Sequence, residues 1–105
     1  MRFPPETAAA LRRDLVKRGS VLATRLSEVL AGKQSPAITA MLMAKPGLRP
    51  EEVVRLAIDQ IEGRRALLDA GDDRFGRCDV CGIEIPEAAL RDMPWADRCQ
   101  QHAAT

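Results

Sequence analysis

The chain has 105 residues, a formal net charge of +1, and only three aromatic residues, two phenylalanines and one tryptophan. This length leaves room for one domain, or for one small module with an appendage, and the few aromatic residues favour helix packing through Leu, Ile, Val and Ala. The almost balanced charge argues against a general nucleic-acid binder, because such proteins usually carry a strong basic excess.

No apolar run approaches the roughly 20 residues that a membrane-spanning helix needs, and the first residues do not lead into a signal-peptide core. We therefore expect no membrane association and a cytoplasmic location. In that compartment, closely spaced cysteines bind metal more readily than they form disulfides.

The segment from residue 6 to residue 31 predicts a long amphipathic helix. It contains no proline, and its larger apolar residues recur at offsets of three, four and seven, with Gly32 as the expected stop. An apolar stripe of this kind needs a partner to pack against. The residues of the stripe are Leu11, Leu15, Leu22, Leu26 and Val29.

Residues 32 to 50 have glycine and proline at their ends, which predicts a compact connector. Ser35 can cap a short helix that has Pro36 in its first turn and ends before Pro46. In one interpretation, the apolar residues of this segment close one end of a core. In the other, they form an exposed tip that contacts a partner, since methionines suit adaptable surfaces. The candidate contact residues are Ile38, Met41, Leu42 and Lys45.

A second long helix is predicted from Pro50 to about residue 70, where Gly71 follows as a stop signal. Two such helices joined by a compact connector should fold into an antiparallel hairpin. In that arrangement, residues whose numbers sum to about 82 would face each other. The predicted pairs are Leu22 with Ile61, Leu26 with Leu56, Leu15 with Leu67, and Gly19 with Gly63.

All three cysteines and the only histidine lie in one stretch, as Cys78-x2-Cys81, seventeen residues, and Cys99-x2-His102. Two ligand pairs about 15 to 20 residues apart let a compact loop bring two tight turns around one tetrahedral ion. Four protein ligands leave no coordination position for water, so we predict one structural Zn²⁺. Gly82 supports the first turn, because glycine adopts a positive φ easily.

Two alternatives concern this site. A redox dithiol formed by Cys78 and Cys81 would leave Cys99 and His102 unexplained. His102 is separated from Cys99 by two residues, fewer than the usual three to five in a pair that includes histidine, so water or a carboxylate is the alternative fourth ligand.

Around the ligands, residues 83 to 85 are long enough only for a strand or hairpin arm, and residues 86 to 91 start like a short helix. The complete prediction is a mostly α protein, with a two-helix antiparallel, coiled-coil-like hairpin in residues 1 to 71 and a small C-terminal zinc finger in residues 72 to 105. The expected apolar cover of the metal site is Phe75, Ile85, Leu90, Met93 and Trp95.

The sequence contains no G-x-S-x-G, no glycine-rich phosphate loop and no HExxH. Its single histidine is already used if it binds zinc, and its carboxylates suit surface or helix-end positions. We therefore expect a protein that is not an enzyme.

Residues 67 to 99 contain a helix ending in Asp-Ala-Gly, then Phe-Gly-x-Cys-x-x-Cys-Gly, an Ile-Pro start to a short helix, and the second ligand pair. In this order they resemble the zinc-finger region of the DksA/TraR family of bacterial transcription regulators. The resemblance covers about a third of the chain. The hairpin that precedes it agrees with this family in architecture, although its sequence is not distinctive.

The resemblance implies a protein that binds RNA polymerase rather than promoter DNA, inserts a helical hairpin into the secondary channel and modulates initiation, in some members together with ppGpp. It also implies zinc ligands at Cys78, Cys81, Cys99 and His102, with histidine where most members would have cysteine. The best-known members carry acidic residues at the hairpin tip, whereas residues 29 to 50 contain no Asp or Glu, and the hairpin here looks short.

The predicted function is therefore a zinc-binding transcription regulator that contacts bacterial RNA polymerase directly, without sequence-specific DNA binding. The alternative, favoured by the non-acidic tip, is a zinc-stabilised adaptor for an unrelated protein partner. A third hypothesis is nucleic-acid binding through the first helix, which would show a steep salt dependence. Its candidate phosphate contacts are Arg12, Arg13, Lys17, Arg18 and Arg25.

Overall fold

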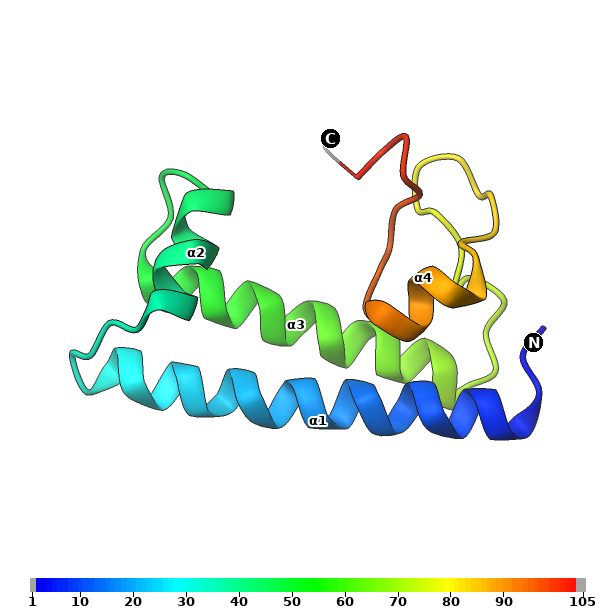
Figure 1. The fold of residues 1–105 in the computed structure, drawn as a ribbon, viewed down its shortest axis with the longest axis horizontal. Helices are drawn as coiled ribbons and strands as arrows, with labels where there is room; N and C mark the ends of the chain where they lie inside the picture. Colours follow the sequence, from blue (N-terminus) through cyan, green and yellow to red (C-terminus); the bar gives the residue numbers. More distant parts are fainter. Residues whose placement is uncertain (1, 104–105) are drawn as a thin grey trace.

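The computed structural model describes residues 2 to 103, and within that range the protein is mostly helical. The helices are α1 (Pro5–Leu30), α2 (Pro36–Ala44), α3 (Pro50–Asp69) and α4 (Glu87–Asp92). α1 and α3 pack antiparallel along their length, and α4 lies with the finger at the end where α1 begins (Figure 1). The predicted helical hairpin with a small C-terminal finger is confirmed.

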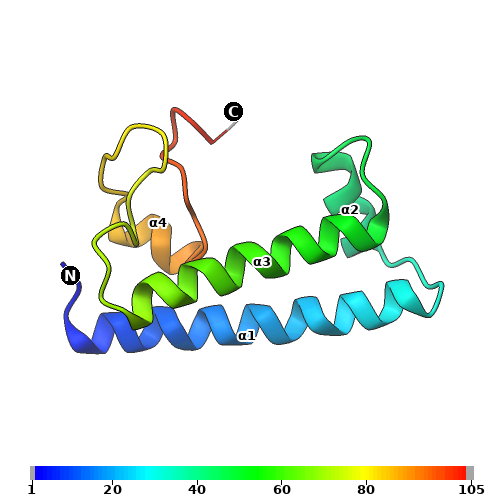
Figure 2. The same ribbon diagram turned by 180° about the vertical axis from the view of Figure 1, so that it is seen from behind.

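The molecule is elongated, with extents of 42 × 27 × 20 Å. α2 packs against α3 near the opposite end of the hairpin from the finger. Seen from the front and from behind, α2 and the finger rise on the same side of the hairpin, above α3 (Figures 1 and 2). The hairpin therefore separates the metal-binding end of the molecule from the connector end.

The ends of the long helices follow from their local sequence. Both begin with a proline in the first turn, where a missing N–H breaks no helical hydrogen bond. At the end of α3, the Gly71 N–H donates to the Leu68 carbonyl (3.1 Å) and the Asp72 N–H donates to the Leu67 carbonyl (2.9 Å). This Schellman turn requires the positive φ of 66° that Gly71 adopts. α1 ends in the same way at Gly32.

One apolar core runs from the hairpin into the finger. Side chains from both long helices, from the finger and from the N-terminal segment belong to the same buried cluster. Its members are Phe3, Leu11, Leu15, Leu22, Ile61, Leu68, Phe75, Ile85 and Leu90. Because the finger shares this core, it is packed onto the base of the hairpin rather than hanging from its end.

The predicted register has mixed outcomes. Leu22 and Ile61 are both in the core, and a Cβ at Gly19 would lie in ordinary contact, 3.6 Å from the Ile61 Cγ2 atom. Leu56 is 49% exposed and contributes little to the helix interface. The predicted opposition of two glycines is wrong, because nothing lies within 4 Å of a Cβ built at Gly63.

The connector helix begins as the sequence predicts. The Ser35 hydroxyl accepts a hydrogen bond from the Ile38 N–H (3.4 Å), and Pro36 is the first residue of α2. Ile38 is fully buried, so it cannot be part of a contact surface, and the half-buried Met41 packs against the core. For these two residues, the interpretation as the closed end of a core is correct. Leu42 is half-buried and Lys45 is exposed.

In the finger, the short helix predicted near residues 86 to 91 is α4, and residues 83 to 85 form the predicted hairpin arm rather than a regular strand. Among residues 2 to 103, the only β pairing is an isolated antiparallel bridge between Arg77 and Glu84. Three of the expected cover residues are buried and Trp95 is half-buried. Met93, the C-cap residue of α4, is 47% exposed, so its predicted role in the cover is wrong. Within the described range, none of the helices has the length and apolar character that crossing a membrane requires.

Candidate metal centre

The first ligand pair lies on a tight turn. The Gly82 N–H donates to the Cys78 carbonyl (2.9 Å), and the Cys78 N–H donates to the Ile83 carbonyl (2.9 Å). Gly82 has the positive φ that the sequence predicts, at 75°. The Val80 N–H points at the Cys78 sulfur, 3.4 Å away. This turn is therefore a knuckle whose backbone donors face a thiolate.

The second ligand pair lies on another turn, in which the His102 N–H donates to the Cys99 carbonyl (3.0 Å). The two turns are joined by the Asp79 N–H, which donates to the Asp97 carbonyl (2.8 Å). Asp79 lies between the first two cysteines, so this bond holds the second segment against the first knuckle.

The four predicted ligands form one cluster, with all four donor atoms within 4.8 Å of one another. The sulfurs of Cys81 and Cys99 are 3.8 Å apart, and His102 Nδ1 is 3.6 Å from the Cys78 sulfur and 3.2 Å from the Cys99 sulfur. A tetrahedral Zn²⁺ with Zn–S bonds of about 2.3 Å and a Zn–N bond of about 2.0 Å would place sulfurs about 3.8 Å apart and sulfur about 3.5 Å from nitrogen. The cluster therefore fits one structural zinc ion.

His102 joins this cluster through Nδ1, the ring nitrogen nearer to the backbone. A short Cys-x2-His spacing brings the imidazole close to the cysteines, and Nδ1 then faces them directly. This geometry favours His102 as the fourth ligand over the alternative of water or a carboxylate. The thiolates and the imidazole form the Cys3His donor set that is common in structural zinc sites.

The protonation of the cysteines is set by their surroundings. Burial raises the pKa of Cys78, but the backbone N–H groups of Cys99, Cys81 and Val80 lower it more, to about 6. For Cys81, the Ile83 N–H lowers the pKa, whereas burial and the neighbouring thiols outweigh this effect and raise it above its ordinary value. Cys78 therefore presents a thiolate to a metal more readily than Cys81.

The three cysteines are free thiols rather than a disulfide. The separation of 3.8 Å between Cys81 and Cys99 is far longer than a disulfide bond of about 2.05 Å. The redox dithiol alternative for Cys78 and Cys81 leaves the convergence of Cys99 and His102 without a cause, and a zinc site explains all four positions.

The finger is attached to α3 by two polar side chains. Gln60 donates to the Trp95 carbonyl (3.1 Å), and Arg64 reaches the Asp79 carboxylate in the first knuckle (2.5 Å). Arg64 is buried, and its Nη1 atom has no hydrogen-bond partner among the described residues. A buried guanidinium is costly without a carboxylate, so Asp79 stabilises the buried Arg64.

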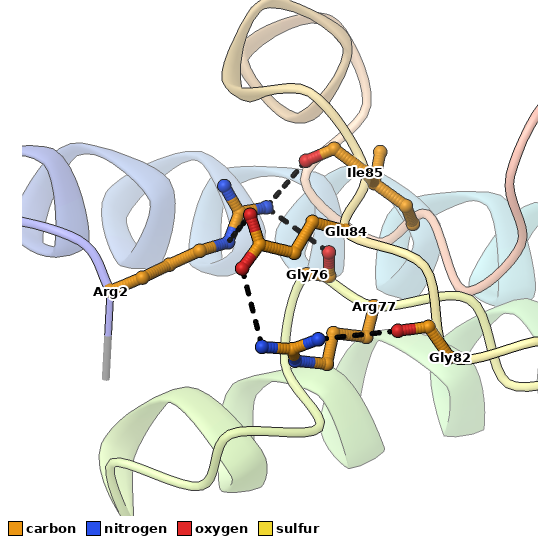
Figure 3. Close-up of polar contacts among 6 residues, drawn as sticks. All are labelled: Arg2, Gly76, Arg77, Gly82, Glu84 and Ile85. Carbon is orange, nitrogen blue, oxygen red and sulfur yellow. Dashed lines mark hydrogen bonds and ion pairs between the residues drawn. The ribbon is translucent and has the colours of Figure 1, made fainter.

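The N-terminal segment closes the other side of the finger, as Figure 3 shows. Arg2 Nη2 donates to the Gly76 carbonyl (3.2 Å) and to the Ile85 carbonyl, and the Arg2 guanidinium lies near the Glu84 carboxylate (3.9 Å). Arg77 binds the other oxygen of Glu84 (3.2 Å). Arg2 thus ties the N-terminal segment to the hairpin arm at residues 83 to 85.

Phe3 follows Arg2 into the same contact. Its ring meets the Phe75 ring edge-on, with the centroids 5.9 Å apart. Gly76 lies directly against Phe3, because a Cβ at this position would come within 3.0 Å of the ring. We call Arg2 and Phe3 together the N-terminal clamp.

Sequence reasoning found the four ligands but missed the clamp and Arg64. Arg2 and Phe3 precede the first helix and carry no periodic pattern. Arg64 lies in α3 among other charged residues, and nothing in the local sequence separates it from an exposed arginine.

The fold and the site define a helical hairpin whose base is stabilised by a Cys3His zinc finger. No protein-family model, no curated protein and no solved structure matches the chain.

Proposed function

We propose that this protein is a transcription regulator that acts by binding bacterial RNA polymerase directly. The proposal is supported by the resemblance of residues 67 to 99 to the DksA/TraR zinc finger and by the hairpin built on that finger. The observation that carries it is the position of the Cys3His site at the base of the hairpin, beside finger residues that share the hairpin's core. Zinc then serves as a brace that holds the hairpin as a rigid projection for insertion into a partner.

Contact with a protein partner is favoured over nucleic acid by the state of the basic residues on α1. Arg12 is paired with Asp69 (2.8 Å), and Arg25 is paired with Glu28 (2.9 Å). The guanidinium of Arg18 lies over the Trp95 ring, 5.2 Å from its centroid. These three arginines of the five candidates have partners within the protein, which weakens the case for a phosphate-binding face.

The experiment is co-purification with core RNA polymerase, followed by transcription in vitro with and without ppGpp. Stoichiometric binding and a change in initiation are the expected results. The Cys81→Ser variant, in which zinc binding is weakened, should lose both effects because the hairpin loses its brace. The proposal fails if the wild-type protein neither binds the polymerase nor alters transcription.

A second candidate function is an adaptor for another protein. It is favoured by the absence of acidic residues between Glu28 and Glu51, where the best-known polymerase regulators of this type carry them. A stable complex that contains no polymerase, and that is lost when Leu42 is replaced by glutamate, would support the adaptor.

A further inference from the structure

We infer that the groove between α1 and the end of α4 is a binding site for a small zwitterion, with the chemistry of a free apolar α-amino acid. The groove lies where the hairpin meets the finger, and it shares no lining residue with the zinc cluster. The inference concerns a small-molecule ligand and does not depend on the proposed contact with RNA polymerase.

Two separate parts of the chain form the walls of this groove, which has a volume of about 230 Å³. One wall is a single face of α1, whose lining residues recur at offsets of three and four, and they are Asp14, Lys17, Arg18 and Val21. The other wall comes from the end of α4 and the residues after it, and its lining residues are Arg91, Asp92, Pro94 and Trp95. Pockets for drug-sized ligands enclose about 300 to 1,000 Å³, so this groove suits a smaller molecule.

The groove has an apolar surface on which a short aliphatic side chain can pack. Pro94 is buried, Trp95 is half-buried, and Val21 faces them from α1 at 37% exposure. The Arg18 guanidinium lies over the Trp95 ring, 5.2 Å from its centroid, and joins the two walls. A guanidinium stacked in this way keeps its in-plane N–H groups free to donate to a carboxylate.

Charged side chains of both signs line each wall, and within residues 2 to 103 none of them has an ion pair. They are Asp14, Lys17 and Arg18 on α1, and Arg91 and Asp92 at the end of α4. By contrast, nine other arginines in the same range have a carboxylate partner. A ligand with both an ammonium and a carboxylate would give partners to both signs at once, through charge-assisted hydrogen bonds.

Ligands with one sign of charge fit this lining less well. Its three basic and two acidic side chains sum to a net charge of only +1. A simple organic anion would face Asp14 and Asp92 without any compensation, and the several charges of a nucleotide polyphosphate would increase that repulsion. An amine without an acid group would leave the three cations without a partner. The zwitterion is therefore the class of ligand that matches the groove.

Trp95 is the only tryptophan of the chain, so its fluorescence reports directly on this groove. Titration of the zinc-loaded protein with L-leucine should give a saturable change in this fluorescence, with a Kd on the order of 1 mM. L-leucinamide lacks the carboxylate and N-acetyl-L-leucine lacks the ammonium, and each should bind at least about tenfold more weakly. In two-dimensional NMR spectra, the shifts caused by L-leucine should gather at residues 14 to 21 and 91 to 95.

Variants test which charges make the contact. Lys17→Gln/Arg91→Gln should weaken L-leucine binding about tenfold because it removes two of the cations, and Asp14→Asn should weaken it about fivefold because it removes an acceptor for the ammonium. These side chains make no ion pair within the described range, so the fold should be retained, as circular dichroism can check.

The matched controls are Arg13→Gln/Lys33→Gln and Asp59→Asn. They make the same changes of charge on exposed residues that lie outside the groove and that also have no ion pair within residues 2 to 103. Each control should alter the affinity for L-leucine less than about twofold, because distant surface charges are screened.

Several results would overturn the inference. One is the absence of a saturable change in both fluorescence and NMR up to about 20 mM L-leucine, which is well above the expected Kd. Another is binding of L-leucinamide or N-acetyl-L-leucine as tight as that of L-leucine, or an equal loss of affinity in the controls. Guanosine tetraphosphate is titrated in parallel, and its binding at these residues in place of L-leucine would show an anion site instead. None of these results bears on polymerase binding, which co-purification tests separately.

Discussion

Replacing Gly76 with alanine should destabilise the protein through two separate effects. Gly76 has a φ of 80°, a left-handed conformation that costs an L-residue with a side chain about 1 to 2 kcal/mol. The new Cβ would also lie 3.0 Å from the Phe3 Cζ atom and 3.2 Å from Arg2 Nη2. The ring is buried, so relieving this contact requires a shift in the core, at about 1 to 3 kcal/mol. The expected loss is about 2 to 5 kcal/mol.

The matched control is Gly71→Ala. Gly71 has a similar φ of 66°, but nothing lies within 4 Å of a Cβ at that position. Its expected cost is therefore the backbone part alone, about 1 to 2 kcal/mol. Urea unfolding of both variants and of the wild type is monitored by far-ultraviolet circular dichroism at a fixed free zinc concentration.

A second background separates the two effects. Phe3→Leu removes the ring atoms nearest to Gly76 while keeping an apolar side chain in the clamp. In this background the cost of Gly76→Ala should fall towards that of Gly71→Ala, a coupling of about 1 kcal/mol or more. Equal costs for Gly76→Ala and Gly71→Ala in the wild-type background would refute the contact between the clamp and the finger.

Four further predictions concern other sites. Gly63→Ala should raise the free energy of unfolding by about 0.5 to 1 kcal/mol, because its helical Cβ meets open space, and urea unfolding measures the gain. Asp79→Ala should destabilise by about 1 to 3 kcal/mol and cost more than Arg64→Met, because only the first leaves a buried charge without its carboxylate. Asp72→Asn should lower stability at neutral pH. Hydrogen bonds from the Arg74 side chain and N–H hold the Asp72 pKa at about 2, so the difference from wild type should be full above about pH 4 and shrink as the pH falls towards 2. Chelation should release one Zn²⁺ per chain, counted by mass spectrometry, and melt the finger while most of the α1 and α3 circular dichroism remains.

For three of these predictions, a specific result would contradict the reasoning. A loss of stability in Gly63→Ala would mean that α3 needs flexibility or space at that position. An equal cost for Asp79→Ala and Arg64→Met would mean that the buried guanidinium finds another partner. Retention of the finger fold after complete zinc removal, seen by NMR, would show that the apolar core alone is sufficient.

The features that the sequence could predict are those encoded by neighbours along the chain. Ser35 before Pro36 specifies the start of α2, and Gly71 after α3 specifies its end, because caps act over about six residues or fewer. The zinc ligands were also predictable, since their spacing leaves few ways to satisfy four donors around one ion. Helix caps and ligand spacings are predictable because each restricts the local geometry of the chain by itself.

The remaining features depend on side chains that are distant in the sequence. The contact between Arg2 and the Ile85 carbonyl could not be predicted, because no local pattern connects those two positions. The predicted opposition of Gly19 and Gly63 in the hairpin was wrong for a related reason. An antiparallel register fixes which turns are adjacent, but the rotation of each helix decides which side faces inward, and at Gly63 that side faces solvent.

The N-terminal clamp also fixes an order of events during synthesis. Arg2 leaves the ribosome well before its acceptor at Ile85, which follows 83 positions later. α1 and α3 can pair before that, whereas the clamp has no acceptor until Ile85 has emerged. The entropic cost of closing a loop rises only slowly with its length. The long separation between the clamp and its acceptor therefore matters more for the folding rate than for the final stability. A nascent chain halted before the finger would hold Phe3 without its Phe75 partner, as an exposed apolar side chain that a chaperone could recognise.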